Sequence, residues 1–429
     1  MTMAMSSALL TDHYELTMLE ASLRSGAASR RAVFEVFARQ LPGGRRYGVV
    51  AGTGRVLEAL ERFRFEDEDL AFLRDNQVVD SRTLEFLAGY RFSGHLYGYA
   101  EGECYFPGSP IMTVEGTFAE AVLLETVILS VLNHDCAIAT AASRMIHAAG
   151  SRPLIEMGSR RTHEMSAVAA ARAAYLAGFS ATSNLMAGHA YGVPTAGTAA
   201  HAFTLLHDSE EQAFQAQINS LGTGTTLLVD TYDVAQAVRT AVELAGPSLG
   251  AVRLDSGDLA QVAHEVREQL DALGAHKTRI IVTSDLDEYA IAALASAPVD
   301  VYGVGTSLVT GSGSPTAALV YKLVAREDAD GIMRPVAKRS VGKPSRGGRK
   351  DAFRKLDATG TAIAELVTVA GDRPADARPL QVQLVKDGEV VGRETLERIR
   401  GRHRDAVAEL PAPAHQLSRG YAAIPTMFD

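Results

Sequence analysis

The sequence predicts an α/β fold: an irregular, TIM-like α/β barrel with a second α+β domain that the N- and C-terminal flanks form together. Three observations support this prediction. Through the middle of the chain, short apolar runs alternate with helix-like stretches about every 20–30 residues. A polar or glycine residue follows nearly every run. The flanks instead carry glycine, tyrosine and β-forming residues with frequent turn signals.

The central alternation begins near residue 151 and ends near residue 309. Strands are predicted at residues 153–157, 180–182, 193–196, 225–229, 251–254, 279–282 and 299–304. Helices are predicted at residues 162–177, 234–245, 259–273 and 288–295, with a short one before residue 193. Strands that alternate with helices pair in parallel, and about seven such units suit a barrel or a large open sheet.

Polar residues follow the predicted strands at Arg160, Ser183, Thr198, Asp230, Asp255, Asp285 and Thr306. In a barrel, the carboxyl ends of all strands form one active-site face. An open sheet gathers its functional residues mainly at one switch point. The even spread of these residues therefore favours the barrel and predicts an active site at this face.

The flanks predict a different architecture. Residues 89–114 predict short antiparallel strands, and residues 118–132 predict a buried helix. Further strands are predicted within residues 318–338 and 379–393, the second with a Lys386-Asp387-Gly388 hairpin turn. We expect an N-terminal α+β domain over residues 1–135, the α/β barrel over residues 136–315, and a C-terminal segment over residues 316–429 that packs on the N-terminal domain.

Composition narrows the class of protein. Hydrophobic residues make up 47% and charged residues 22% of the chain, as in globular proteins. The net charge of −9 disfavours nucleic acid and anionic membranes as partners. Cys104 and Cys136 are too few for a disulfide framework, and Glu120 and Glu125 interrupt the most apolar stretch. These features, with no signal peptide apparent, predict a cytoplasmic protein without a membrane partner.

Arginine carries the positive charge of most of the chain, because no lysine precedes Lys277. Arginine binds carboxylates and phosphates through two parallel hydrogen bonds. Arg160 and Arg161, in Gly158-Ser159-Arg160-Arg161, follow a predicted strand and are candidates for binding an anion. Adjacent arginines are also common on solvated helix surfaces, so this alternative stays open.

Two polar turns could bind phosphate. Asp255-Ser256-Gly257-Asp258 opens a predicted helix, where free amides bind anions and carboxylates can hold a ribose hydroxyl or Mg²⁺. The second turn is Gly303-Val304-Gly305-Thr306, extended by Gly311-Ser312-Gly313. Either could instead be structural, the first as a helix cap and the second as a tight turn. Together, on one barrel face, they favour a phosphorylated ligand.

His201 ends Gly197-Thr198-Ala199-Ala200-His201 after a predicted strand, which puts it at the active-site face. The nearby histidines, His163, His189 and His207, do not have the spacing of a zinc signature. A structural histidine remains the alternative. The basic stretch at residues 338–350 could close over a polyanionic ligand or form a solvated surface loop.

In combination, seven segments resemble nicotinate phosphoribosyltransferases along nearly the whole chain. They are Leu10-Thr11-Asp12-His13-Tyr14, Gly158-Ser159-Arg160-Arg161, Ala181-Thr182-Ser183-Asn184, Gly197-Thr198-Ala199-Ala200-His201, Val252-Arg253-Leu254-Asp255-Ser256-Gly257-Asp258, Thr283-Ser284-Asp285-Leu286-Asp287 and Gly303-Val304-Gly305-Thr306. The resemblance implies that nicotinate and phosphoribosyl pyrophosphate give nicotinate mononucleotide and pyrophosphate, in NAD biosynthesis. It also implies coupling to ATP hydrolysis, Mg²⁺ as cofactor, and a homodimer with shared active sites.

The resemblance also implies roles for individual residues. His201 matches the histidine that ATP phosphorylates in this family. Tyr14, Thr198 and Arg253 match the pocket for the pyridine ring and its carboxylate, with Tyr14 donated across the dimer interface. Residues around the phosphoribosyl group and its magnesium are matched by Arg160, Asp255, Asp285, Gly305 and Thr306. Asp255 is expected to support the positive charge that develops on the sugar.

Ser183 bears on whether the substrate base is nicotinate or nicotinamide. The related nicotinamide enzyme carries an aspartate at about this place, so a neutral serine favours nicotinate. The basic stretch departs from the family pattern at Ser345-Arg346 and Arg349, which leaves its role open.

Three alternatives can be separated. One is the same fold acting on nicotinamide or on another base without ATP. A second is a phosphoribosyl-metabolite-binding barrel without turnover. A sugar-phosphate aldolase or isomerase barrel is disfavoured, because a Schiff-base aldolase needs a lysine inside the barrel and Lys277 precedes its strand.

Overall fold

The computed structural model describes residues 6–338, 345–369, 371 and 373–429. The chain divides into two compact units. One unit is continuous, Ala141–Gly313, and the other combines Met1–Thr140 with Ser314–Asp429. The N-terminal and C-terminal flanks thus belong to one compact body, as the fold prediction states.

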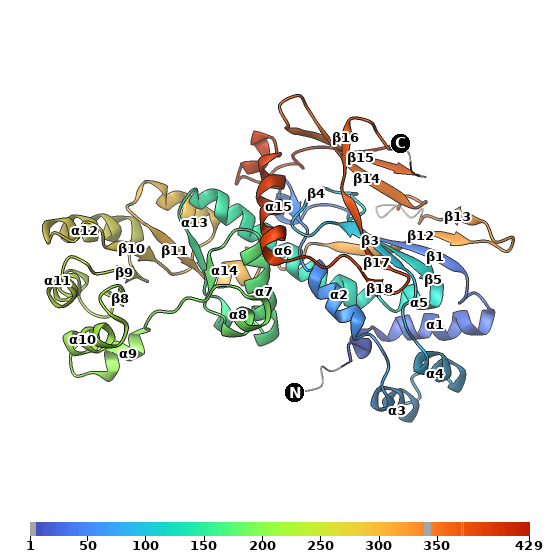
Figure 1. Ribbon diagram of the computed structural model, residues 1–429, viewed down its shortest axis with the longest axis horizontal. Helices are drawn as coiled ribbons and strands as arrows, with labels where there is room; N and C mark the ends of the chain where they lie inside the picture. Colours follow the sequence, from blue (N-terminus) through green and yellow to red (C-terminus); the bar gives the residue numbers. More distant parts are fainter. Residues whose placement is uncertain (1–5, 339–344, 370, 372) are drawn as a thin grey trace. The chain divides into compact units, whose positions relative to one another are not determined.

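The unit Ala141–Gly313 is built on a six-stranded parallel sheet that is curled into a half-barrel, with the strand order β7-β6-β11-β10-β9-β8 (Figure 1). Its strands are β6 (Leu154–Glu156), β7 (Ala181–Thr182), β8 (Thr226–Leu228), β9 (Ala251–Leu254), β10 (Arg279–Val282) and β11 (Val301–Val304). Its helices are α7 (Glu164–Leu176), α8 (Leu185–Tyr191), α9 (His201–Leu206), α10 (Glu210–Leu221), α11 (Val234–Ala245), α12 (Leu259–Ala272), α13 (Glu288–Ala293) and α14 (Thr306–Val309), with the 3-10 turns η3 (Ser159–Arg161) and η4 (Leu294–Ser296). The predicted parallel sheet is confirmed.

The helix α11 illustrates how the sequence sets these elements. Asp233 caps its first turn by accepting a hydrogen bond from the Gln236 amide at 2.8 Å. Its buried residues recur every three to four positions and so form one apolar face: Ala237, Val238, Ala241, Val242 and Ala245. Gly246 ends the helix with φ at 74°, in the region that favours glycine.

The edges of this sheet explain why the barrel is irregular. Within Ala141–Gly313, all of which the structure describes, no ladder joins β7 to β8. The strand predicted at residues 193–196 contributes only a parallel bridge between Thr195 and Thr182. Pro194 accepts a hydrogen bond from the Thr182 amide at 2.9 Å but has no amide hydrogen of its own to extend the ladder. The strand predicted at residues 193–196 was therefore too long.

The other unit contains a seven-stranded sheet with the order β13-β12-β1-β5-β3-β17-β18, a four-stranded sheet with the order β16-β14-β15-β19, and the pair β2-β4. The strands are β1 (Arg31–Ala38), β2 (Gly48–Val49), β3 (His95–Tyr99), β4 (Cys104–Tyr105), β5 (Met112–Thr117), β12 (Leu319–Glu327), β13 (Met333–Pro335), β14 (Lys350–Leu356), β15 (Ala362–Val369), β16 (Ala377–Pro379), β17 (Gln381–Lys386), β18 (Glu389–Val390) and β19 (Thr426–Phe428). The helices are α1 (His13–Ser25), α2 (Thr53–Glu61), α3 (Asp67–Asp75), α4 (Ser81–Ala88), α5 (Phe118–Val122), α15 (Leu396–Ala408) and the first part of α6 (Glu125–Ala149).

The strand β1 ties the two flanks together, because it pairs antiparallel with both β5 and β12. Phe34 of β1 stacks on Tyr321 of β12 with ring centroids 4.8 Å apart, and Phe118 lies 6.1 Å from Phe34 in the same core. This confirms that the flanks form one α+β unit.

Two local predictions in this unit had different outcomes. The Lys386-Asp387-Gly388 turn is confirmed, since β17 and β18 form a hairpin in which Asp387 and Gly388 have φ of 49° and 79°. The single helix predicted at residues 118–132 is instead two helices, α5 and α6. Glu15 accepts the Thr126 amide at 3.0 Å and so provides the new helix start with a hydrogen-bond acceptor.

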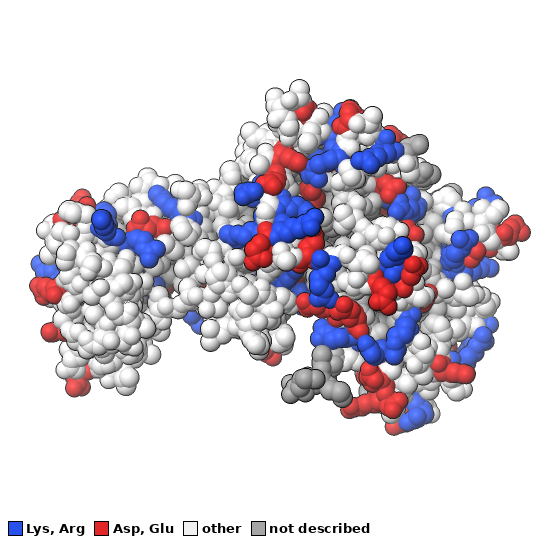
Figure 2. All heavy atoms as spheres, viewed as in Figure 1, with Lys and Arg blue, Asp and Glu red and all other residues white. Residues whose placement is uncertain are grey.

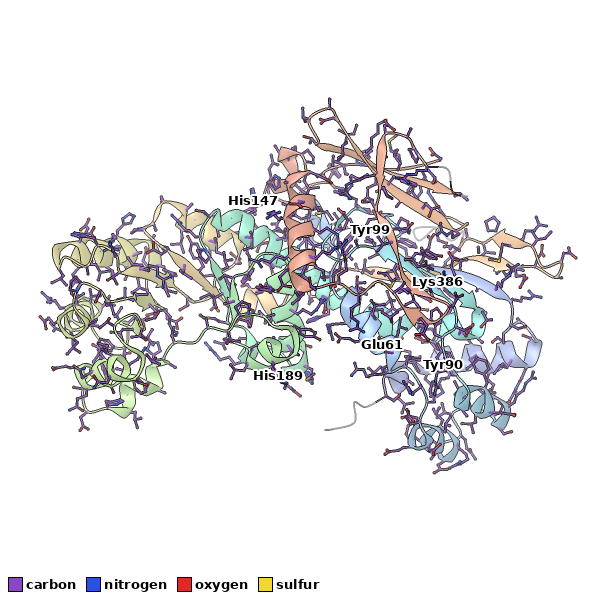
Figure 3. All side chains as sticks on the ribbon, viewed as in Figure 1. Glu61, Tyr90, Tyr99, His147, His189 and Lys386 are labelled. Carbon is purple, nitrogen blue, oxygen red and sulfur yellow. The ribbon has the colours of Figure 1, made fainter. Side chains whose placement is uncertain are left out.

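A network of buried charges connects the two smaller sheets. Arg354 of β14 is fully buried and donates to Glu365 of β15 and to the carbonyl of Cys104, both at 2.8 Å. Tyr99 (Figure 3) donates its hydroxyl to Glu365 at 3.3 Å. Removing one member would leave the others buried without compensation, so the network fixes how these strands pack.

The surface and the cysteines complete this description. On the face seen in Figure 2, basic and acidic side chains are interspersed. None of the helices in the described ranges combines the length and apolarity needed to cross a membrane. Cys104 and Cys136 are both buried and unpaired, and burial raises the pKa of both thiols.

His403 on α15 predicts an acid-sensitive step in stability. It is buried, its Nδ1 lies 3.1 Å from the Gly102 carbonyl oxygen, and burial lowers its pKa to about 4. The unfolded chain protonates this histidine near its ordinary pKa of about 6.5. Acidification between these two values therefore stabilises the unfolded state, whereas above about pH 6.5 the group makes no difference.

We expect the free energy of unfolding of the wild-type protein to fall when the pH is lowered from about 7.5 to about 5. This fall should be about 2 kcal/mol larger for the wild-type protein than for His403→Gln. Urea denaturation of both proteins at the two pH values measures this difference. Equal losses would show that His403 is not held neutral by its burial.

Candidate functional site

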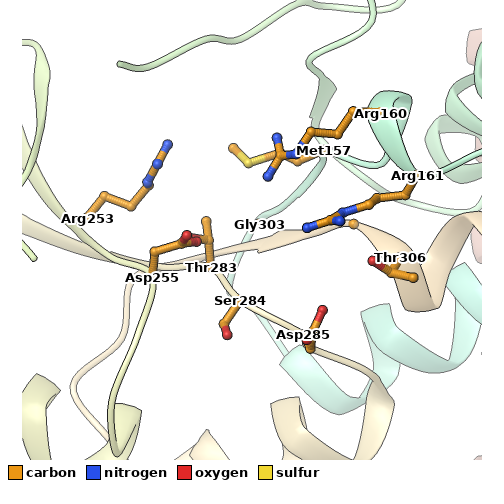
Figure 4. Close-up of a pocket in the computed structure, with 11 residues that line it drawn as sticks. Met157, Arg160, Arg161, Arg253, Asp255, Thr283, Ser284, Asp285, Gly303 and Thr306 are labelled. Atoms are coloured by element: carbon orange, nitrogen blue, oxygen red, sulfur yellow. The ribbon is translucent and has the colours of Figure 1, made fainter. Parts of the chain in front are cut away.

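A pocket opens at the carboxyl ends of β6, β9, β10 and β11, where the barrel fold predicts the active site (Figure 4). Its volume is about 180 Å³. It is lined by Met157, Arg160, Arg161, Arg253, Asp255, Thr283, Ser284, Asp285, Gly303, Gly305 and Thr306. Of the predicted site residues, the structure therefore brings together Arg160, Arg253, Asp255, Asp285, Gly305 and Thr306.

Three arginines supply the positive charge of the pocket. Arg160 and Arg161 come from η3 after β6, and Arg253 comes from β9 (Figure 4). Arg160 and Arg161 are exposed, whereas Arg253 is partly buried and its Nε has no hydrogen-bond partner among the described residues. Burial lowers the pKa of Arg253, although Asp255 and Asp230 oppose this shift. The pocket is thus prepared for an anion.

The carboxylates of the pocket differ in how they are held. Asp255 accepts a hydrogen bond from the Thr283 hydroxyl, and its own amide donates to Asp230 at 2.9 Å. Asp285 is exposed on the turn after β10. Ser284, just before it, has φ of 116°, which is rare for a residue with a side chain. Backbone strain of this kind concentrates at functional sites.

Gly303 and Gly305, the two glycines of the predicted turn after β11, have separate roles. A Cβ at Gly303 would lie 2.6 Å from Thr283 Cγ2 and 2.8 Å from Met157 Sδ, so only glycine fits between these strands. Gly305 and Thr306 line the pocket at the start of α14. The Gly311-Ser312-Gly313 extension does not line it. Ser312 instead donates its hydroxyl to Glu288 at 2.5 Å, so this extension is a structural turn.

His201 lies at the start of α9, where its ring lies near the side chains of Thr231 and Asp230. Its Nδ1 lies 3.2 Å from the Thr231 hydroxyl, and its Nε2 lies 3.9 Å from Asp230 Oδ1. The side chain of Asp230 is 3% exposed, and its Oδ2 accepts from the Asp255 amide and the Ser256 hydroxyl. Asp230 therefore connects the histidine to the Asp255 turn.

Thr198 provides the second connection. It lies on the segment before α9 and accepts a hydrogen bond from Arg253. The structure thus brings the Gly197–His201 segment and β9 together, although Thr198 and His201 are not among the residues that line the pocket.

Ser183 and Asp258 stand outside the pocket. Ser183 is exposed after β7 and donates its amide to the Glu156 carbonyl at 2.8 Å. Asp258 caps α12 by accepting the Gln261 amide at 3.2 Å, which is the structural role considered for it. Ser256 and Gly257 complete this turn, and Gly257 has φ of 86°.

Two acidic residues to which the sequence assigns no role, Asp230 and Glu156, organise the site. Asp230 was noted only as a strand end. Glu156 is fully buried at the end of β6 and accepts hydrogen bonds from the Gly158 amide and the Thr182 hydroxyl, while burial raises its pKa. The sequence could not predict these hydrogen bonds, because the partners of each carboxylate lie on or after neighbouring strands that are distant in sequence.

Tyr14 belongs to the other unit, where it lies on α1. Its side chain is 45% exposed. Partial burial, together with the neighbouring carboxylates of Glu125 and Glu15, raises the pKa of Tyr14. Tyr14 is therefore a neutral hydroxyl at ordinary pH.

The basic stretch at residues 338–350 also belongs to that unit, and residues 339–344, with Arg339 and Lys343, lie outside the described residues. Arg349 pairs with Glu115 at 2.9 Å, and Lys350 pairs with Glu35 at 2.7 Å. These two cations are therefore structural, while Arg346 has its guanidinium 4.1 Å from the Phe428 ring centroid.

Comparison with known proteins identifies two family models in the chain. Residues 9–133 match the nicotinate phosphoribosyltransferase N-terminal domain, and residues 138–312 match the quinolinate phosphoribosyl transferase C-terminal domain. The nicotinate phosphoribosyltransferase pncB1 of Mycobacterium tuberculosis (strain CDC 1551 / Oshkosh) is 58% identical, over 97% of this chain and 94% of its own length.

Two solved structures resemble the whole chain. Human nicotinic acid phosphoribosyltransferase has a TM-score of 0.84 at 27% identity, covering 98% of this chain and 97% of its own. The nicotinate-nucleotide pyrophosphorylase of Pyrococcus furiosus has a TM-score of 0.78 at 25% identity, covering 95% and 98%. With the fold, the arginine-lined pocket and this identity in agreement, the chain belongs to the nicotinate phosphoribosyltransferase family and is an enzyme of NAD biosynthesis.

Proposed function

We propose that the pocket at the carboxyl ends of β6, β9, β10 and β11 is where this enzyme joins nicotinate to phosphoribosyl pyrophosphate, and that ATP drives the reaction through His201. One observation carries the proposal. Arg253 lines the pocket and also binds Thr198, in the segment that ends at His201. A single side chain thus connects the anion pocket with the histidine segment.

Arg253 and Thr198 are suited to bind the nicotinate carboxylate. A partly buried guanidinium with an unpaired Nε gains a charge-assisted hydrogen bond when a carboxylate arrives. Ser183 lies outside the pocket, so its neutral side chain bears on the choice of base only through the family resemblance. Nicotinamide has no such charge and would gain less from Arg253.

The phosphoribosyl group would lie across the opposite side of the pocket. Arg160 and Arg161 are exposed in the pocket and would bind pyrophosphate oxygens, and Thr306 offers a hydroxyl beside the backbone at Gly305. Asp285 is placed to accept hydrogen bonds from ribose hydroxyls. These roles rest on chemical type and on membership of one pocket.

In the reaction, the pyridine nitrogen of nicotinate donates its electron pair to C1 of the ribose. The bond between C1 and the pyrophosphate oxygen breaks, and pyrophosphate leaves with that electron pair. Positive charge develops on the sugar, and Asp255, oriented by Thr283, stabilises it. The arginines stabilise the negative charge on the leaving group.

Magnesium fits the donor set of this pocket. Mg²⁺ is commonly held by one or two carboxylates together with substrate phosphate oxygens, and Asp255 and Asp285 supply the carboxylates here. When bound, the ion would neutralise part of the pyrophosphate charge.

The ATP step would use the polar groups around His201, which are the Thr231 hydroxyl and the Asp230 carboxylate. Asp230 Oδ1 faces Nε2 and favours a proton on that nitrogen, which leaves the electron pair on Nδ1 beside Thr231. Attack of Nδ1 on the terminal phosphorus of ATP forms an N–P bond and releases ADP. The His201 side chain is 40% exposed, so a nucleotide can reach it.

We further propose a homodimer with shared active sites, in which Tyr14 of one copy contacts the nicotinate ring in the other. The ring of Tyr14 is 45% exposed and supports this, since an aromatic ring can stack on a pyridine.

The substrate assignment is tested by measuring product formation from nicotinate and from nicotinamide in parallel, with and without ATP. We expect nicotinate to be strongly preferred and ATP to stimulate its use. A preference for nicotinamide would contradict the assignment. Binding of phosphoribosyl pyrophosphate without any product would indicate a non-catalytic barrel.

His201→Ala is expected to lose both the acid-labile phosphate formed with ATP and Mg²⁺ and the stimulation by ATP, while ATP-independent transfer continues. Radiolabelled phosphate on the protein and nicotinate consumption measure the two effects. His189→Ala is the matched control, because His189 is an exposed histidine of the same unit (Figure 3). Full ATP stimulation in His201→Ala would disprove the phosphohistidine role.

Arg253→Gln is expected to raise KM for nicotinate by about 10–100-fold, the value of one charge-assisted hydrogen bond. The KM for phosphoribosyl pyrophosphate should change much less. Steady-state kinetics with each substrate varied separately measure this split. Arg239→Gln, an exposed arginine on α11, is the control. An unchanged KM for nicotinate would remove Arg253 from the base pocket.

A further inference from the structure

Arg160 and Arg161 reach the pocket from η3, a single short turn after β6 (Figure 4). Within this turn, the Arg161 amide donates to the Gly158 carbonyl oxygen at 2.8 Å. Short 3-10 segments have poor hydrogen-bond geometry, so they depend on their surroundings for a fixed position. Whatever fixes Gly158 therefore fixes the backbone from which both guanidinium groups extend.

Glu156, the last residue of β6, joins this turn to the neighbouring strand β7. Glu156 is fully buried. Its Oε1 accepts a hydrogen bond from the Gly158 amide, and its Oε2 accepts one from the Thr182 hydroxyl at the end of β7. One carboxylate thus connects the turns that follow two adjacent strands of the sheet.

A second connection joins the same two turns. The Thr182 hydroxyl oxygen accepts from the Asn184 amide at 2.9 Å, and Asn184 Nδ2 donates to the Ser159 hydroxyl at 3.0 Å. Asn184 is held in turn as the N-cap of α8. The hydrogen bonds therefore form a closed ring through Glu156, Thr182, Asn184, Ser159 and Gly158.

Gly158 has no room to shift within this ring. A Cβ at this position would overlap Val309 Cγ1 and would lie 3.0 Å from both the Gly305 carbonyl oxygen and Glu156 Oε1. Gly305 itself lines the pocket at the start of α14. The arginine turn is therefore packed against a second pocket turn, and Glu156 holds it there.

The ring needs two acceptors at the position of Glu156. The Gly158 amide can only donate, and the Thr182 hydroxyl, which accepts from Asn184, directs its own hydrogen to Glu156. A glutamine would either turn its NH₂ group toward the Gly158 amide or leave the Thr182 hydroxyl hydrogen without an acceptor. Burial raises the pKa of Glu156, and the two hydrogen bonds oppose this shift because they favour the ionised form.

We propose that Glu156 is a positioning residue for phosphoribosyl pyrophosphate, because its ring holds the turn from which Arg160 and Arg161 bind the pyrophosphate group. Glu156 does not line the pocket, so it acts through the turn and not by touching the substrate. Nicotinate binding is assigned to Arg253, which extends from strand β9 and is outside the ring. The inference rests on the proposed function, so its test includes a binding measurement that requires no turnover.

The test compares Thr182→Val with Thr182→Ser in steady-state kinetics with each substrate varied separately. Valine keeps the shape of threonine but removes the hydroxyl from the ring, whereas serine keeps the hydroxyl. We expect Thr182→Val to raise KM for phosphoribosyl pyrophosphate about tenfold or more, with a much smaller change in KM for nicotinate. Thr182→Ser should stay close to the wild-type protein.

Two further variants open the ring at other points. Glu156→Gln should raise KM for phosphoribosyl pyrophosphate as Thr182→Val does. Ser159→Ala removes only the connection to Asn184 and should raise it about two- to fivefold. If Glu156→Gln does not fold, Thr182→Val and Ser159→Ala decide the question.

Isothermal titration calorimetry with inorganic pyrophosphate and Mg²⁺ measures the same effect without turnover. Pyrophosphate should bind to Thr182→Val about tenfold or more weakly than to the wild-type protein. Weakened binding together with a failed nicotinate assay would support the ring and contradict the proposed reaction. Unchanged binding together with a successful nicotinate assay would contradict the ring and leave the reaction intact.

Thr278→Val is the matched control. Thr278 is 1% exposed in the same unit and donates its hydroxyl to the Leu249 carbonyl oxygen at 2.9 Å, but it precedes β10, at the end of the sheet opposite the pocket. Circular dichroism and the thermal midpoint show which variants are folded. The proposal is overturned by an unchanged KM for phosphoribosyl pyrophosphate in folded Thr182→Val, by an equal rise in both KM values, or by an equal effect of Thr278→Val.

Discussion

The parallel register of β6, β11, β10 and β9 is the constraint on which the candidate site depends. Leu254 pairs with Val282, and Val304 pairs with Glu156, so the residues that follow these positions come together at one edge. This is why the Thr283 hydroxyl reaches Asp255 and why Gly305 lies against Met157. A shift of one residue would turn these side chains to the opposite face of the sheet. The chemistry of the pocket is therefore set by hydrogen bonds between backbones.

Much of the fold followed from periodicity. The bounds of α11, β9 and β10 agree with the prediction, because α11 has one apolar face between clear cap residues and β9 and β10 are short, largely buried runs. What could not be predicted depends on distant contacts. The four-stranded sheet was not predicted, because two of its strands carry charged residues, Arg354 and Glu365, that a sequence pattern assigns to the surface. These residues are buried because they form an ion pair with each other. The break between α5 and α6 depends on Glu15, more than a hundred residues away in sequence.

The candidate site also contains residues that the sequence could predict and residues that it could not. Motif positions such as Asp255 and Thr306 could be chosen from the sequence, because a barrel brings strand ends together and the family resemblance selected among them. Asp230 and Glu156 could not, because each acts through hydrogen bonds to neighbouring strands. The arginines differ in a related way. Arg354 donates to a buried carboxylate and serves packing, whereas Arg253 donates to the Thr198 hydroxyl and lines the pocket.

The scarcity of lysine has a consequence for control of the enzyme. In Ala141–Gly313 the only lysine is Lys277, which is exposed and lines no part of the pocket, so the pocket cations are all arginine. Acetylation neutralises lysine but does not act on guanidinium groups, and arginine holds its proton well into alkaline solution. The anion-binding charge of this pocket is thus insensitive to acyl donors that accumulate when metabolism is rich in acetyl groups. Lysine acetylation therefore offers no means of neutralising the cations of this pocket.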